Sequence, residues 1–180
     1  MKRVPIAVVL TVALSGCGYV QSQVITGQPL PSGTAPADAC APQNLAAMAG
    51  KPATAAIAAN PGLSGMLAGL DRAGLRTLDD APALTLFATS DRFLAYFPFR
   101  NIPALWDNPK ELAQILKQAA VGERLDPARL PGTHTTMGGT RVIGGGEPGS
   151  LRVNDTKVVC QQLGTANAAV YIVDQLVTQR

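Results

Sequence analysis

Cysteine and histidine are the residues of this 180-residue chain whose side chains could do chemistry. The chain has three cysteines but a single histidine, His134, which lies between Thr133 and Thr135 in a predicted strand. One histidine cannot build a multi-histidine metal site, and a catalytic triad would depend on this residue alone. Histidine-based catalysis is therefore poorly supported.

Two glycine-containing segments also fail as catalytic or cofactor motifs. Gly62-Leu63-Ser64-Gly65 does not have the glycine spacing of a nucleophile elbow. Gly144-Gly145-Gly146 is not followed by the Lys and Ser or Thr of a phosphate-binding loop. We predict that the chain is not an enzyme and that it binds no cofactor and no metal.

Cys17 carries the strongest chemical signal. It follows Lys2, Arg3 and an apolar run from Val4 to Leu14 that is shorter than the about 20 residues needed to span a bilayer, as in a secretory signal. The sequence Leu14-Ser15-Gly16-Cys17 resembles the lipobox of bacterial lipoproteins, which implies lipidation of Cys17 and cleavage before it. Several acyl chains give stable anchoring. A simple secretory signal followed by a chance cysteine is the alternative.

Removal of residues 1–16 leaves 164 residues, enough for one domain and a tail. The net charge falls from +3 to +1, because Lys2 and Arg3 are lost. No basic patch indicates nucleic acid. Aromatic residues make up only 4% of the chain, which also weakens any stacking mode of binding. We predict no nucleic-acid partner.

Cys40 and Cys160 remain after lipidation of Cys17. An exported protein folds where disulfides persist, and an even number of remaining cysteines indicates one bridge. A bridge closing a loop of about 120 residues would stabilise the fold by about 4 to 5 kcal/mol in the loop-entropy description. Two unpaired buried thiols are the alternative.

Residues 17–39 are predicted to be the lipidated cysteine and a flexible spacer, and residues 40–180 a single globular domain. The spacer is rich in Pro and small polar residues and has no apolar periodicity. Ser32 and Thr34 lie among prolines and could carry sugars.

The first half of the domain shows helical periodicity. Apolar residues recur at helical spacing from Ala55 to Leu70, interrupted at residues 60–62, and a helix should end near Gly74. Residues 84–88 are apolar on both faces and predict a buried strand, after which Asp91 offers helix-capping chemistry. Asn108-Pro109 predicts another helix start.

The second half changes to strand-like patterns. Gly138-Gly139 and Asn154-Asp155 predict two-residue hairpin turns, and Ala169 to Leu176 predicts a last strand. Helices in the first half followed by hairpins in the second predict an α+β domain.

Two segments resemble the fasciclin-like domain family. Leu84-Thr85-Leu86-Phe87-Ala88-Thr89-Ser90-Asp91-Arg92-Phe93 is similar to its first conserved block, and Thr165-Ala166-Asn167-Ala168-Ala169-Val170-Tyr171-Ile172-Val173-Asp174 to its second. Leu151 to Cys160, with Cys40, resembles the mycobacterial secreted and lipid-anchored antigens of this family. The resemblance covers residues 50–180 and implies a wedge of β-strands with helices packed along one edge.

The resemblance also implies a non-catalytic adhesion or interaction module without cofactors. Many relatives carry a Tyr-His pair where this chain has Gln118 and Ala119. We expect structural roles for three matched residues: Asp91 as a helix cap, Asn167 as a turn residue before the last strand, and Asp174 in local pairing at its end.

An aromatic cluster gives a candidate partner patch, which consists of Tyr96, Phe97, Phe99, Arg100 and Trp106. Aromatic residues and Arg are enriched at interfaces. Burial of these side chains in the core is the competing interpretation, and Phe93 matches a buried position of the family.

We therefore predict an extracytoplasmic lipoprotein, attached to the cell membrane through Cys17, that acts by binding a protein or another envelope component. Two alternatives remain open. One is a lipoprotein that holds a hydrophobic small ligand, which would need an apolar cavity of a few hundred Å³. The other is a structural protein of the envelope.

Overall fold

The computed structural model describes residues 38–94, 103–147, 149–160 and 163–177. The predictions for the leader, Cys17, Ser32 and Thr34, and for four members of the aromatic patch (Tyr96, Phe97, Phe99 and Arg100), fall outside these residues. None of the helices in the described part of the chain is long and apolar enough to cross a membrane.

Short helices occupy most of the first half of the domain, as the periodicity predicted. The break at residues 60–62 is a 3-10 turn, and the helix after it ends at Arg72, just before the left-handed Gly74. The helices are α1 (Pro42–Met48), α2 (Ala53–Ala58), η1 (Pro61–Leu63), α3 (Ser64–Arg72), η2 (Leu75–Asp80), α4 (Asp91–Leu94), α5 (Pro103–Trp106) and α6 (Pro109–Lys117).

All strands but the first two lie after residue 130, which confirms the α+β class and the concentration of strands in the C-terminal half. They are β1 (Leu84–Thr89), β2 (Ala120–Val121), β3 (Gly132–Thr135), β4 (Arg141–Gly145), β5 (Arg152–Val153), β6 (Thr156–Lys157), β7 (Leu163–Gly164) and β8 (Ala168–Val173).

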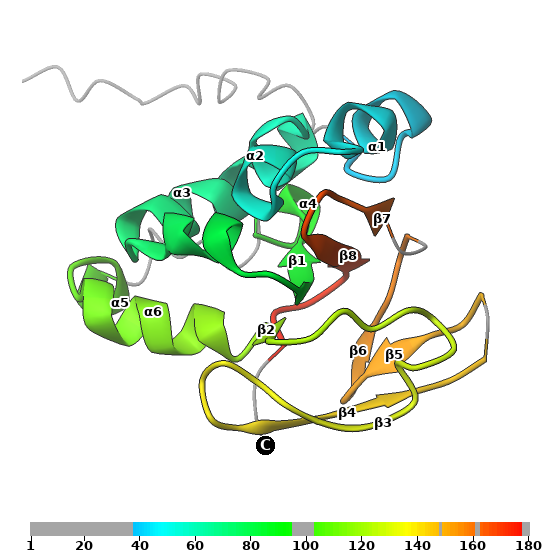
Figure 1. The fold of residues 1–180 in the computed structure, drawn as a ribbon. Coiled ribbons are helices and arrows are strands. Elements are labelled where there is room, and N and C mark those ends of the chain that lie inside the picture. Colours follow the sequence, from blue (N-terminus) through cyan, green and yellow to red (C-terminus); the bar gives the residue numbers. More distant parts are fainter. Residues whose placement is uncertain (1–37, 95–102, 148, 161–162, 178–180) are drawn as a thin grey trace, which may run out of the picture. The chain divides into compact units, whose positions relative to one another are not determined.

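The strands form two four-stranded sheets, ordered β2-β1-β8-β7 and β3-β4-β5-β6. In the first sheet β1 and β8 are parallel, in a register that runs from Leu84 opposite Ala168 to Thr89 opposite Val173. Figure 1 shows the β1–β8 pair between the helices on one side and the β3–β6 sheet on the other. The domain therefore has three layers.

Two hydrophobic cores separate these layers. Leu86 and Val170 belong to the core between the first sheet and the helices, whereas Phe87 and Tyr171 face the core shared with the second sheet. Because side chains alternate along a strand, one residue of each neighbouring pair enters each core. All six residues of β1 and all six of β8 are buried, as the apolar sequence predicted for β1.

One predicted turn is correct and one is wrong. Asn154 has a positive φ of 53° in the two-residue turn between β5 and β6, as predicted. The turn at Gly138-Gly139 is wider, because β3 ends at Thr135 and β4 begins at Arg141. Thr136 bonds Thr140 through both backbone and side chain, and the N–H of Met137 donates to the carbonyl of Ala120. The backbone bond from Thr136 to Thr140 continues the hairpin, so residues 137–139 form a three-residue turn.

Helix starts are capped both by neighbouring residues and by residues that are distant in the sequence. Asn108 accepts a hydrogen bond from the backbone N–H of Glu111 at 3.2 Å and caps α6 as predicted. Asp91 lies at the start of α4 but caps α3 instead: its carboxylate accepts from the backbone N–H groups of Ser64 at 2.9 Å and Gly65 at 2.7 Å. A carboxylate at a helix N-terminus is favourable because it meets unpaired donors and the positive end of the dipole.

Asn167 has a different role from the predicted turn conformation, since its φ is not positive. Its Oδ1 accepts from the backbone N–H of Ala53 at 2.9 Å, in the first turn of α2. Its Nδ2 lies 3.0 to 3.1 Å from three backbone carbonyls at the end of η2, those of Leu78, Asp79 and Ala81. Asn167 thus joins the start of β8 to two helices.

We expect Asn167→Ala to lower the free energy of unfolding by about 2 to 4 kcal/mol, because part-buried backbone donors and acceptors lose their partner. Asn167→Asp should be at least as harmful at neutral pH, because a carboxylate oxygen would face three carbonyl oxygens. Urea unfolding measures both. Asn44→Ala is the control, since Asn44 donates to a single exposed carbonyl, that of Asp38. An Asp variant as stable as the original chain would contradict this role.

Candidate functional site

The structure joins Cys40 and Cys160 in a disulfide, with Cα atoms 5.7 Å apart, as predicted. The bridge ties the start of the domain to the segment that follows β6. Asp174 pairs locally as expected: its carboxylate accepts from the backbone N–H of Lys157 at 2.9 Å, and its own N–H donates to the carbonyl of that residue.

Trp106 is the one member of the predicted aromatic patch that the structure describes. Its ring is partly buried against the helical core, and the guanidinium carbon of Arg72 lies 5.9 Å from the ring centroid. The Nε of Arg72 also donates to the backbone carbonyl of Trp106 at 3.0 Å. Trp106 therefore already has an intramolecular cationic partner, and the patch as a whole stays a prediction.

The loop between β2 and β3, residues 122–131, brings together the largest group of interacting charged side chains in the described part of the chain. Leu125 and Leu130 of this loop are fully buried and enter the core between the two sheets. Their burial holds the loop against the sheets while Glu123 and Arg129 remain about half exposed.

Buried hydroxyl groups hold the backbone of this loop in place through hydrogen bonds. Thr85 of β1 accepts from the backbone N–H of Leu125 at 2.8 Å and donates to the carbonyl of Glu123 at 2.6 Å. The hydroxyl of Tyr171, on β8, donates to the carbonyl of Leu125 at 2.7 Å. Arg124 reaches the carbonyl of Thr165 at 3.2 Å. These bonds connect the loop backbone to both central strands and to the turn before β8.

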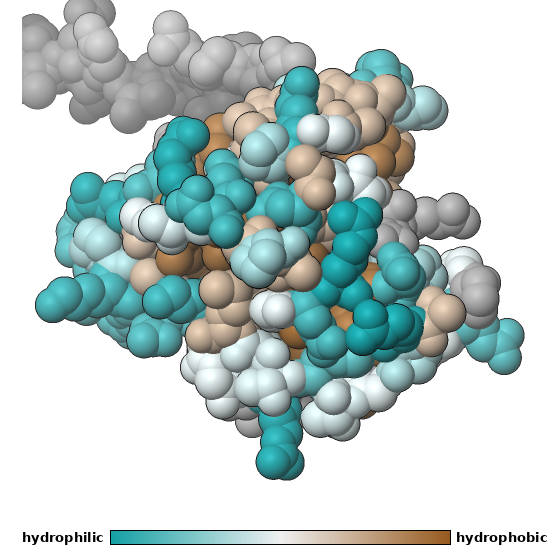
Figure 2. Space-filling model, in the orientation of Figure 1, coloured by the Kyte–Doolittle hydropathy of each residue, from teal (hydrophilic) through white to brown (hydrophobic). Residues whose placement is uncertain are grey.

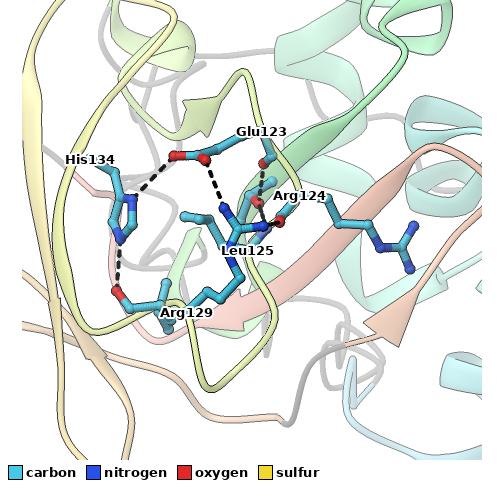
Figure 3. Close-up of polar contacts among 7 residues, drawn as sticks. Glu123, Arg124, Leu125, Arg129 and His134 are labelled. Carbon is cyan, nitrogen blue, oxygen red and sulfur yellow. Dashed lines mark hydrogen bonds and ion pairs between the residues drawn. The ribbon is translucent and has the colours of Figure 1, made fainter.

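His134 completes this cluster (Figure 3). Its Nε2 lies 2.9 Å from the carbonyl oxygen of Leu130, and its Nδ1 lies 3.3 Å from Oε1 of Glu123. A carbonyl can only accept, so Nε2 donates to it; a hydrogen bond from Nδ1 to Glu123 then requires a ring that carries both protons. Arg129 reaches the other carboxylate oxygen of Glu123 at 3.2 Å.

The cluster has the geometry of a fixed polar surface. Both ring nitrogens of His134 face acceptors within the protein, and among the described residues no hydroxyl or thiol is hydrogen-bonded to the ring as an attacking group would be. Within the described residues no group of three or more His, Cys, Asp or Glu side chains could hold a metal ion. Every buried side-chain nitrogen or oxygen described there has a hydrogen-bond partner.

Sequence reasoning placed His134 in a strand, which is correct, but missed its partners. Glu123 lies 11 residues before it in a loop without periodicity, so no spacing rule connects the two residues. The one feature of the sequence that could have indicated this contact was a lone histidine that follows several charged residues.

The described structure also contains an open hollow of about 430 Å³ beside the disulfide. It lies just beyond the carboxyl ends of the parallel strands β1 and β8, where ligands of α/β sheets commonly bind. Both apolar and charged residues line it: Asp38, Ala39, Cys40, Ser90, Arg92, Phe93, Val159 and Asp174. Three charged side chains make it unlike the enclosed apolar cavity expected for a hydrophobic ligand.

The outer surface seen in Figure 2 is mainly polar. Hydrophilic residues cover the helices and the loops on this face, and hydrophobic residues show only in small areas between them. This distribution agrees with the burial of nearly all large apolar side chains in the two cores.

Comparison with known proteins identifies the class. The Fasciclin domain family model matches residues 61–179, so the chain belongs to the fasciclin domain family, which confirms the resemblance seen in the sequence. Among solved structures, a FAS1 domain pair from the insect cell adhesion molecule Fasciclin I has a TM-score of 0.59 at 10% identity, over 72% of this chain and 51% of that chain. This likeness supports the fold.

Curated relatives define the neighbourhood more closely. Immunogenic protein MPB70 of Mycobacterium bovis is 30% identical over 147 residues, which are 79% of this chain and 76% of that protein. Cell surface glycolipoprotein MPB83 of the same species is 31% identical over 138 residues, 74% of this chain and 63% of that protein. The chain is thus similar to an immunogenic protein and to a cell surface glycolipoprotein of mycobacteria.

The buried Tyr171 gives this site a testable response to alkaline pH. Burial, and then the negative charge of Asp126, raise the pKa of Tyr171 from 10.0 to about 12. The phenol of the unfolded chain loses its proton near pH 10, so the folded state loses stability as the pH rises from 10 towards 12, at about 1.4 kcal/mol per unit. Below pH 10 the contribution of this group is fully present.

We expect Tyr171→Phe to be less stable by about 1 kcal/mol at pH 7, because the carbonyl of Leu125 loses a donor. Between pH 10 and 12 the free energy of unfolding should fall less in the variant than in the original chain. The difference in this free energy between the two chains should therefore narrow or reverse. Urea unfolding across this range, with phenolate absorbance as a second measure, tests the prediction. A constant difference at all pH values would contradict it.

Proposed function

We propose that this protein is a lipid-anchored extracytoplasmic fasciclin domain that binds a protein or another envelope component and does no catalysis. The lipobox-like sequence at Cys17, the disulfide and the similarity to a cell surface glycolipoprotein support this proposal. The membrane is its first partner, through the acylated cysteine.

The loop between β2 and β3 is the observation that carries the binding role. Its backbone is fixed by Thr85 and Tyr171, while Arg129 and Glu123 expose 62% and 46% of their side chains. A surface that is already ordered loses little conformational entropy on binding, so a rigid charged loop on a buried base suits recognition of a partner. An exposed ion pair of this kind contributes little to stability by itself.

The anchor is tested by expressing the full chain in an actinobacterial host beside Cys17→Ala. We expect the original chain to begin at Cys17, to carry acyl-chain mass and to partition with membranes, whereas the variant is released into the medium. Intact mass and membrane fractionation provide the readout. An unacylated original chain that is secreted like the variant would refute the anchor and leave a diffusible fasciclin protein.

The binding surface is tested by photocrosslinking from single positions in intact cells. Arg129 and Arg76 are a matched pair, because each exposes 62% of its side chain and each pairs with a carboxylate, Glu123 and Asp71 respectively. We expect a crosslinker at position 129 to yield discrete products that one at position 76 does not, and Glu123→Gln to reduce them several-fold. Equal products from both positions would contradict a role of the loop.

The hollow beside the disulfide favours a second candidate, a small-ligand lipoprotein. Its volume of about 430 Å³ suits a small molecule, and Phe93 and Val159 supply apolar surface. Asp38, Arg92 and Asp174 in its wall favour a ligand with charged groups over a purely hydrophobic one. If the protein instead has only a structural role in the envelope, neither the loop between β2 and β3 nor the hollow should bind a partner or a ligand.

A further inference from the structure

The outward surface of the β3–β6 sheet combines three cations with exposed apolar side chains. Its inner side carries Val142 and Val153 and is buried in the core between the sheets. The opposite side, here called the outer face, consists of Thr133, Thr135, Arg141, Ile143, Arg152 and Lys157, all of which are exposed.

Strand register places these residues together. Ile143 lies opposite Thr133, and Arg141 lies opposite Thr135. On the other side of β4, Arg152 pairs with Gly145 and is itself opposite Lys157. Directly opposed residues of an antiparallel pair point to the same side of a sheet. The three cations therefore surround the isoleucine on one surface.

In the described part of the chain, the large apolar side chains that are exposed lie in this sheet and its connections. The large hydrophobic residues exposed in the described parts of the chain are Ile143 at 61%, Met137 at 43% and Val159 at 43%. Ile143 lies at the centre of β4, Met137 in the turn before it, and Val159 two residues after β6. The helical layer contributes none of them.

The charged residues of the outer face are all positive. No acidic residue belongs to it. The nearest acids in sequence are Glu147 after β4, Asp155 in the β5–β6 turn, and Asp174, which binds the backbone of Lys157. A backbone carbonyl, that of Asp155, accepts a hydrogen bond from Arg152 at 2.7 Å.

We propose that the outer face rests on the anionic surface of the membrane to which the protein is anchored, with the three cations against lipid phosphates and Ile143 at the headgroup boundary. This proposal rests on the lipid anchor of the proposed function. Basic residues near an anionic membrane each add a favourable electrostatic contribution, and exposed apolar side chains add burial. A second copy of the chain would bring like charges together and is disfavoured.

The tether lets the outer face reach the membrane, although the chain enters the domain on its helical side. Cys40 is bonded to Cys160, and Ala39 and Cys160 are buried in the core between the first sheet and the helices. The stretch from Cys17 to Asp38 can reach at most about 75 Å, so a tethered domain samples the membrane at high local concentration. Weak contacts then suffice to orient it.

The test uses residues 17–180 with Cys17→Ser, which cannot be acylated; every described helix and strand lies between Pro42 and Val173 and is retained. Sedimentation with vesicles of equal parts phosphatidylglycerol and phosphatidylcholine is compared with vesicles of phosphatidylcholine alone. We expect binding to the anionic vesicles only, and a steep loss as salt is added. No binding to anionic vesicles at low salt would overturn the proposal, even if Cys17 proves to be acylated in cells.

Two triple variants of equal net charge locate the contact. The outer-face triple, Arg141→Gln, Arg152→Gln and Lys157→Gln, should lower the partition coefficient about fivefold per residue, or about a hundredfold together. The control triple removes exposed cations of the helical half, Lys51→Gln, Arg92→Gln and Lys110→Gln, and should change it less than about twofold. Equal losses in both triples would overturn the proposal.

The apolar contact is tested separately by fluorescence. Ile143→Trp should shift its emission to the blue when anionic vesicles are added, whereas Gln114→Trp, at an exposed position of α6, should not; Trp106 is common to both. An unshifted Ile143→Trp would overturn the predicted orientation. Binding of the chain to poly-glutamate but not to vesicles would assign the face to an acidic macromolecule and likewise overturn it.

Discussion

β1 and β8 pair in parallel over all six residues of each strand, and both of their faces are buried. The two strands are far apart in the sequence, so their pairing brings together segments more than 80 residues apart. One face supports the helices and the other supports the second sheet. A parallel pair buried on both sides has no solvated face, which explains why both strands are mainly apolar on both faces, with Thr85 and Thr89 buried among the apolar residues of β1.

The polar side chains around this pair connect distant segments. Asn167, immediately before β8, bonds the start of α2, 114 residues earlier in the chain. Asp91, immediately after β1, caps α3, which begins 27 residues before it. Thr85, within β1, holds the loop that carries Glu123. The two segments that resemble the fasciclin family thus coincide with the strands and with the side chains that attach other elements to them, which gives a structural reason for their pattern.

Local features could be predicted from the sequence, and the partners of polar side chains could not. The buried strand β1, the cap at Asn108 and the turn at Asn154 depend on residues within a few positions of one another. Asp91 caps a helix as predicted, but the helix is α3 rather than α4, and the role of Asn167 was predicted wrongly, because the partners of both residues lie far away in the chain, beyond any spacing rule. The Gly138 turn was predicted too tight because the N–H of Met137 donates to Ala120 of β2, which leaves residue 137 in the turn.

The two sheets differ in what they leave available for binding. The β1–β8 pair is covered on both faces, so it can support other elements but cannot contact a partner. The β3–β6 sheet is covered on one face only, and the loop that leads into it carries Glu123 and Arg129 on a fixed backbone. Helix caps such as Asp91 are already occupied by backbone donors. In the described part of the chain the second sheet, unlike the central one, therefore leaves one face open to solvent, while the helical layer and the central strands hold it in place.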